Sequence, residues 1–176
     1  MNSIVKAHWD SKLPIYDISH LKLQNKGIKS LLIDVDGTLL SRQSNVIPLN
    51  VKKWIRESKK LFSLYLISNN PSDERIRKIA KELDIRYKSN ALKPRKKITL
   101  NVISEMNEDT KNIAIIGDRI FTDVIVGNRC NIQTILVKRL SRKGLPIKLN
   151  LTLILEKLIS IFSVSYTHLR AHETDI

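Results

Sequence analysis

Two aspartates separated by a single residue follow a short apolar run, and their spacing suits nucleophilic and acid–base chemistry. Asp34 and Asp36 come directly after Leu31-Leu32-Ile33 and just before Gly37. Residues two apart in an extended chain point to the same side, so both carboxylates can face one crevice while the glycine lets the chain turn. One carboxylate can then attack an electrophile while the other moves a proton. Asp-Gly is also a common turn sequence, so the catalytic interpretation of this pair needs support from the rest of the chain.

Further polar residues follow at three later points, each after a predicted strand. They are Ser68 with Asn69, then Lys93, and then Asp118 with Asp123. Each has a structural explanation alone, as a helix cap, a solvated surface residue or a turn. The carboxyl ends of parallel strands share one edge of a sheet, so all of these groups would meet in one crevice with the first aspartates. Carboxylates, a hydroxyl and an ammonium together predict a phosphoryl-transfer site.

The elements that position these residues alternate between apolar strands and amphipathic helices. Strands are predicted at 31–34, 61–68, 85–87, 112–117 and 132–137, and helices at 49–60, 72–83, 94–103 and 121–130. This alternation predicts an α/β fold with a doubly wound parallel sheet and helices on both faces. The intervals from Asp36 to Ser68 and from Ser68 to Lys93 have room for little more than one helix and a hairpin or strand each. We therefore expect no sizeable cap domain.

Composition limits the class of protein. The chain has 176 residues of which 42% are hydrophobic, enough for one ordinary core, and no apolar run approaches the roughly 20 residues of a membrane span. The single cysteine, Cys130, excludes an internal disulfide and a cysteine-based zinc cage, which indicates a reducing, cytoplasmic setting. The net charge of +14 favours a polyanionic partner: a nucleic acid, an anionic membrane or a phosphorylated substrate. The sequence gives no signal of an oligomeric state.

The chain divides into four predicted segments. Residues 1–28 form a lead-in, 29–140 a catalytic domain, 141–163 an apolar C-terminal segment, and 164–176 resemble a translated sequencing adapter that we expect to be disordered. On that interpretation His168 and His172, although spaced like a metal pair, carry no chemistry. The apolar segment is rich in leucine and isoleucine, so it could lie on a bilayer or cover an edge of the sheet.

The ordered motifs resemble those of the haloacid dehalogenase superfamily, subfamily IIIA, and more narrowly its YqeG-like branch, which includes phosphatidylglycerophosphate phosphatases. Besides the first aspartates, the resemblance rests on Ser68-Asn69-Asn70, Lys93-Pro94 and Gly117-Asp118-(x)4-Asp123-Val124. It covers nearly all of residues 15–140. The resemblance implies a Rossmann-like sheet and a Mg²⁺-dependent phosphatase that works through an aspartyl-phosphate.

The resemblance and the residue types together suggest a role for each group. Asp34 would attack phosphorus, and Asp36 would protonate the leaving alcohol and later accept a proton from water. The oxygen ligands of Mg²⁺ would be the Asp34 carboxylate, the Asp36 backbone carbonyl and the Asp118 carboxylate. Ser68, Asn69 and Lys93 would bind the phosphoryl group, with Lys93 also acting in catalysis, and Asp123 would hold Lys93 or a metal-bound water as a supporting residue.

Phosphatidylglycerophosphate is the first substrate hypothesis, with phosphatidylglycerol as the product. An uncapped site suits a substrate whose bulk stays outside, and a positive surface suits peripheral contact with an anionic membrane at its inner face. A sugar phosphate or a nucleic-acid end is the alternative, although a nucleic acid is disfavoured because only 5% of the residues are aromatic and could stack on bases. A more distant alternative is a non-catalytic binding module, which would predict loss of Asp34, Asp36 or Lys93; all three are present.

Overall fold

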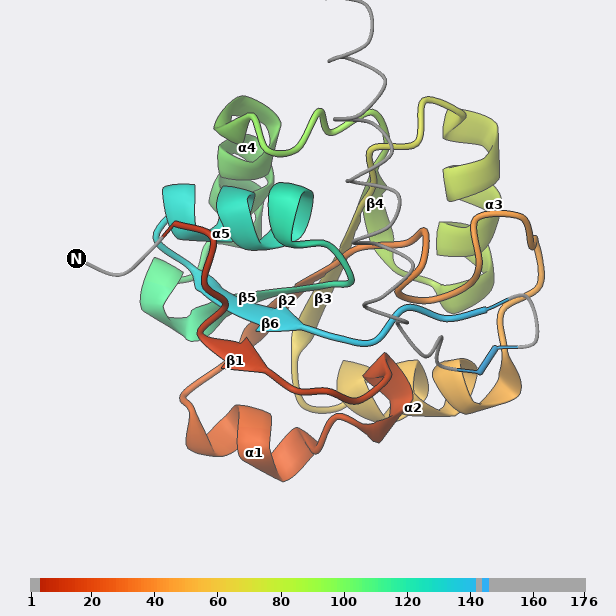
Figure 1. The fold of residues 1–176 in the computed structure, drawn as a ribbon, viewed down its shortest axis with the longest axis horizontal. Coiled ribbons are helices and arrows are strands. Elements are labelled where there is room, and N and C mark those ends of the chain that lie inside the picture. Colours follow the sequence, from red (N-terminus) through yellow and green to blue (C-terminus); the bar gives the residue numbers. More distant parts are fainter. Residues whose placement is uncertain (1–3, 142–143, 146–176) are drawn as a thin grey trace, which may run out of the picture.

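A computed structural model describes residues 4–141 and 144–145 of the chain. Six parallel strands form one sheet in the order β1-β6-β5-β2-β3-β4 (Figure 1). They are β1 Trp9–Asp10, β2 Ser30–Ile33, β3 Ser63–Ile67, β4 Arg86–Lys88, β5 Ile113–Gly117 and β6 Gln133–Leu136. After β2 the chain adds β3 and β4 on one side of it and then β5 and β6 on the other side. The strand β2 therefore lies at the switch point of the sheet.

Helices cover both faces of the sheet, as the sequence predicts. The helical segments are η1 Ile15–Asp17, α1 His20–Asn25, α2 Leu49–Lys59, α3 Asp73–Leu83, α4 Lys96–Met106, η2 Thr110–Asn112, η3 Ile120–Val124 and α5 Ile125–Arg129. Buried residues of α1, α2 and α3 share one hydrophobic cluster, and those of α4 and α5 contribute to a second. Figure 1 shows α1 and α2 below the sheet and α4 and α5 above it. The doubly wound α/β fold is confirmed.

The central strand β2 explains why the first apolar run is continuous rather than alternating. Leu31 and Ile33 pack into the cluster with α1 to α3, whereas Leu32 packs into the cluster with α4 and α5. A strand covered on both faces needs apolar residues at every position. Ile33 is in register with Leu66 of β3 and Ile116 of β5, so the residues that follow these strands reach one edge of the sheet at the same level.

Two parts of the fold differ from the sequence prediction. The segment before residue 29 contributes an edge strand, β1, and the short helix α1. The helix predicted at 121–130 begins instead as a wider, π-helical turn, η3, and only then becomes α5. The side chain of Asp123 is buried in that turn and accepts a hydrogen bond from the Arg119 amide at 3.2 Å, which favours the wider turn over a regular first turn.

The loops at the carboxyl edge are short. Within the described residues, the stretch between β2 and β3 holds one helix, α2, and the stretch between β3 and α4 holds only α3 and β4, so no cap domain covers the edge. None of the described helices combines the length and apolar character needed to cross a bilayer. Most of the predicted apolar C-terminal segment, from residue 146, and the adapter-like residues 164–176 lie outside the described residues.

Candidate active site

The first aspartate sits where β2 ends, in a turn that only glycine fits. The Asp34 amide donates to the Ile116 carbonyl at 2.9 Å, so the residue still follows the sheet, and its side chain is almost fully buried. Gly37 then takes a φ of +98°, in the region that favours glycine. A Cβ at Gly37 would lie 2.7 Å from Oδ2 of Asp118. The glycine therefore lets the loop after β2 lie against the acidic residue that follows β5.

Lys93 is the cation at the centre of the site. Its Nζ donates to Asp34 Oδ1 at 2.7 Å, to Asp123 Oδ1 at 2.6 Å and to the Ile67 carbonyl at 3.0 Å. Burial alone would lower the pKa of this ammonium, but the carboxylates of Asp123 and Asp34 outweigh burial and raise it. Lys93 is therefore a fixed positive charge at every physiological pH.

The backbone of Lys93 is held by a reciprocal pair of hydrogen bonds. The Asn69 side chain donates to the Lys93 carbonyl at 2.8 Å and accepts from the Lys93 amide at 2.8 Å. Asn69 follows β3 at the same edge, so these bonds hold the loop after β3 against the loop that carries Lys93. The predicted residue Asn69 thus has a clear structural role in placing the ammonium.

Burial changes the ionisation of the acidic residues around this ammonium. Burial raises the pKa of Asp34 to about 6; the Lys93 ammonium opposes this rise and the Asp123 carboxylate adds to it. Burial and the nearby Asp34 carboxylate likewise raise the pKa of Asp118. Further positive charge at the site would therefore favour the ionised form that a nucleophilic Asp34 requires.

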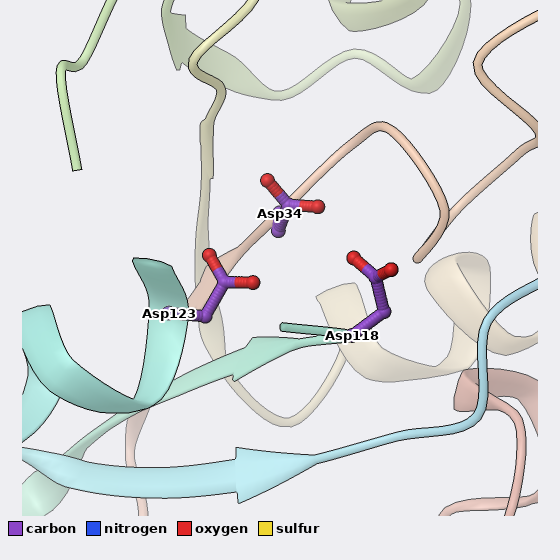
Figure 2. Close-up of side chains that lie close together, drawn as sticks. All are labelled: Asp34, Asp118 and Asp123. Atoms are coloured by element: carbon purple, nitrogen blue, oxygen red, sulfur yellow. The ribbon is translucent and has the colours of Figure 1, made fainter. Parts of the chain in front are cut away.

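Three carboxylates converge in a way that suits a metal ion (Figure 2). One carboxylate oxygen from each of Asp34, Asp118 and Asp123 lies within 4.8 Å of the other two. Oδ1 of Asp118 is buried without a hydrogen-bond partner among the described residues, and Oδ2 accepts from Arg139 Nε at 2.5 Å. Both oxygens of Asp123 already accept, from Lys93 and from the Arg119 amide. Asp34 and Asp118 therefore fit a hard cation such as Mg²⁺ better than Asp123, whose two oxygens already accept hydrogen bonds.

A small pocket opens beside these groups. Its volume is about 60 Å³, and it is lined by Asp34, Asp36, Arg42, Ser68, Asn69, Asn70, Lys93, Arg119 and Thr122. The Ser68 hydroxyl accepts from the Asn70 amide at 3.1 Å, which leaves its proton free to turn toward a pocket oxygen. Five of the predicted site residues thus line one pocket, and Asp123 and Asp118 adjoin it through Lys93 and Asp34.

Three residues that hold these acids in place have no role assigned from the sequence. Arg75 Nη1 donates to Asp36 Oδ1 at 2.7 Å, and Asn70 Nδ2 donates to Asp36 Oδ2 at 2.8 Å. Arg139 pairs with Asp118 in the same way. Arg139 follows β6, so the rule that marks polar residues after strands could have found it. Arg75 lies in the first turn of α3, where it is indistinguishable in sequence from a solvated charge.

The chain is similar in sequence to two known proteins. The chain is 30% identical over 124 residues to a protein of Bacillus subtilis named "Probable phosphatase YqeG", covering 70% of this chain and 72% of that one. It is 27% identical to Phosphatidylglycerophosphate phosphatase 1, chloroplastic/mitochondrial, of Arabidopsis thaliana, covering 70% of this chain but only 38% of that protein.

A solved structure and a family description complete the comparison. The fold matches that of an uncharacterized protein from Listeria monocytogenes with a TM-score of 0.54 at 18% identity, over 70% of this chain and 88% of that one. The model of the family called Mitochondrial PGP phosphatase matches residues 7–140. With its aspartates, serine, lysine and distal acids meeting at one sheet edge in the predicted order, the chain belongs to this phosphatase family, in the YqeG-like part of the haloacid dehalogenase superfamily.

Proposed function

We propose that the protein is a Mg²⁺-dependent phosphatase that removes the terminal phosphate of phosphatidylglycerophosphate through an aspartyl-phosphate. The observation that carries this proposal is the placement of Asp34, which is buried against the Lys93 ammonium and faces a pocket of about 60 Å³. A nucleophile fixed beside a permanent positive charge can meet a phosphoryl group whose negative charge the ammonium balances.

The transfer takes two steps on the chain's own residues. An oxygen of Asp34 attacks phosphorus, the ester P–O bond breaks, and Asp36 gives its proton to the departing alcohol oxygen. Asp36 then takes a proton from water as that water attacks phosphorus. The bond between phosphorus and Asp34 breaks, which releases inorganic phosphate and restores both carboxyl groups.

The remaining groups hold the phosphoryl oxygens and the negative charge. Ser68 donates its hydroxyl proton to one oxygen, and Lys93 balances the charge that grows in the transition state. Arg75 and Asn70 hold the carboxyl of Asp36, which lines the pocket. Mg²⁺ would be held by the carboxylates of Asp34 and Asp118 and the Asp36 carbonyl, where it supplies charge neutralisation at the phosphoryl oxygens.

The shape and charge of the mouth support a lipid substrate. The pocket has room for little beyond a phosphoryl group, and no cap domain encloses the rest of a substrate within the described residues. Arg42 and Arg119 line the pocket and are exposed, so they can pair with a second anionic group, such as a phosphodiester. The Arabidopsis relative is named for this substrate.

Phosphate release distinguishes the substrates. The chain would be offered phosphatidylglycerophosphate in mixed micelles, a soluble sugar phosphate and a 3′-phosphorylated oligonucleotide, each with Mg²⁺, with Asp34→Asn as the blank. The proposal expects a strong preference for the lipid. Equal or greater release from the sugar phosphate or the oligonucleotide would instead support the alternative substrates, and no release dependent on Asp34 would contradict catalysis.

A further inference from the structure

Large apolar side chains stand exposed beside the mouth of the pocket. Leu92 is 46% exposed, Ile120 39% and Phe121 75%. Leu92 precedes the pocket residue Lys93, and Ile120 follows the pocket residue Arg119. The loop that carries Leu92 and the turn η3, which carries Ile120 and Phe121, are joined where the Lys93 ammonium contacts Asp123 at 2.6 Å. These three residues are therefore next in sequence to residues that line the pocket, on two adjoining segments.

Exposed cations accompany these apolar side chains. Arg95, Lys96 and Lys97 are exposed at the start of α4 and take part in no ion pair within the described part of the chain. The first turn of this helix has no acidic residue. Positive charge at a helix N-terminus opposes the helix dipole, so local helix stability does not account for these residues.

Leu92 is unusual in its backbone as well as its exposure. Its φ is +55°, in the left-handed region that a leucine rarely adopts. The residue gains no burial in return, since its side chain is nearly half exposed. A strained and exposed apolar residue next to a site residue is expected where the surface serves binding rather than folding.

We propose that Leu92, Ile120, Phe121, Arg95, Lys96 and Lys97 form a docking surface for an anionic lipid bilayer, with the pocket facing the headgroups. This proposal rests on the lipid substrate proposed above. Apolar side chains enter an interface just below the headgroups while adjacent cations stay at the level of the lipid phosphates. A phosphate ester could then reach the pocket while its acyl chains remain in the bilayer.

The types of side chain favour a bilayer over a single-stranded nucleic acid at this surface. Single strands are bound by stacking on several aromatic rings, and this surface offers only Phe121. Aliphatic side chains contribute little to binding a polynucleotide, whereas they add apolar area in a lipid interface. The net charge of +14 attracts an anionic leaflet, as it would any polyanion, so the apolar side chains make the distinction.

Vesicle sedimentation tests the surface apart from catalysis. The full chain carrying Asp34→Asn would be mixed with vesicles of phosphatidylcholine alone or with phosphatidylglycerol added. Phe121→Ser should weaken binding to the anionic vesicles about tenfold, because a large apolar side chain no longer enters the interface. The double substitution of Lys96 and Lys97 by serine should weaken it about 25-fold, because each cation near the leaflet contributes about fivefold.

Matched controls carry the same changes elsewhere. Leu21→Ser removes a side chain that is 65% exposed on α1, below the sheet, and the double substitution of Lys53 and Lys81 by serine removes two exposed cations from α2 and α3. Both controls should bind vesicles as the parent chain does. Urea denaturation of each variant checks that it folds.

The outcomes separate this surface from the proposed function. Equal weakening by the control substitutions of Lys53 and Lys81 would show a general charge effect and would contradict the proposed docking surface. Unchanged binding by Phe121→Ser and by the double lysine variant would contradict it too, as would a parent chain that does not bind anionic vesicles. In any of these cases hydrolysis of phosphatidylglycerophosphate in micelles would still stand by itself. With Asp34 restored, Phe121→Ser should keep the parent's rate on a soluble phosphomonoester, and a matching loss there would also contradict a role in docking.

Discussion

Replacing Lys93 by methionine should destabilise the fold strongly at neutral pH and much less in acid. The substitution keeps an unbranched side chain of similar length but removes the ammonium. That group contacts Asp34, Asp123 and the Ile67 carbonyl, and the side chain is only 1% exposed. Without it, two buried carboxylates face each other with no counter-charge at this point.

The magnitude follows from burial. Removing one partner of a buried ion pair costs about 3–5 kcal/mol, because the remaining charge stays out of water without compensation. Domains of this size have a free energy of unfolding of roughly 5–15 kcal/mol, so the variant should fold but with a clearly lower urea midpoint. Turnover should also fall by about 10²–10³, the usual loss when a group that stabilises transition-state charge is removed.

The pKa of Asp34 determines how the free energy of unfolding should change with pH. Burial holds the pKa of Asp34 at about 6 in the folded protein, above its ordinary value of 3.8, so the folded state binds the extra proton between those values. Stability from this group therefore falls as pH rises from about 4 to 6. Lys93 opposes the rise in the Asp34 pKa, so its removal pushes that pKa higher and extends the loss above pH 6.

Urea denaturation at pH 5 and pH 7.5 measures the effect, with Lys53→Met as the control because Lys53 is exposed on α2. We expect the Lys93 variant to lose several kcal/mol relative to the parent at pH 7.5 and a clearly smaller amount at pH 5. A loss of the same size at both pH values, or no larger than that of the Lys53 control, would refute the reasoning that links the ammonium to the buried acids.

Three further predictions concern other parts of the site. Ser68→Ala should lower kcat by about 10–10² and leave measurable phosphate release, because Asn69 still positions Lys93; complete loss of turnover would contradict this. Arg75→Gln should lower kcat more than it raises KM, since Arg75 holds the Asp36 carboxyl at 2.7 Å, and Arg75→Lys should recover part of the rate in the same steady-state assay. Gly117→Ala should cost about 1–3 kcal/mol in urea denaturation, because a Cβ there would lie 2.2 Å from the Asp123 carboxyl carbon, and an unchanged midpoint would show that Asp123 can move without cost.

The sequence predicted the sheet well because the relevant patterns are local. The apolar run before Asp34 and the run of 113–116 are buried on both faces, so every position in them is apolar. The polar residue after each run marks the carboxyl edge, which parallel topology then brings together. The meeting of Asp34, Lys93 and Asp123 at one edge follows from that topology.

Other features could not be predicted because they depend on tertiary contacts. The strand β1 has two residues and exists through its pairing with β6, with little pattern of its own. The wide turn η3 depends on a hydrogen bond from the Arg119 amide to the Asp123 side chain. Arg75 reaches Asp36 only because α3 starts beside the loop after β2, and no local spacing reports that distance.

The charges of the site explain why cation and substrate suit it together. Four carboxylates, those of Asp34, Asp36, Asp118 and Asp123, meet three cationic side chains, and each cation comes from a different element after a different strand. Counted with every carboxylate ionised, these paired groups carry one formal negative charge, while Arg42 and Arg119 stay exposed at the mouth, so a phosphate dianion placed against the buried acids is unfavourable without a further cation. A divalent cation offsets the two charges that the dianion brings. One buried oxygen of Asp118 has no hydrogen-bond partner within the described residues, so it is available to bind that divalent cation.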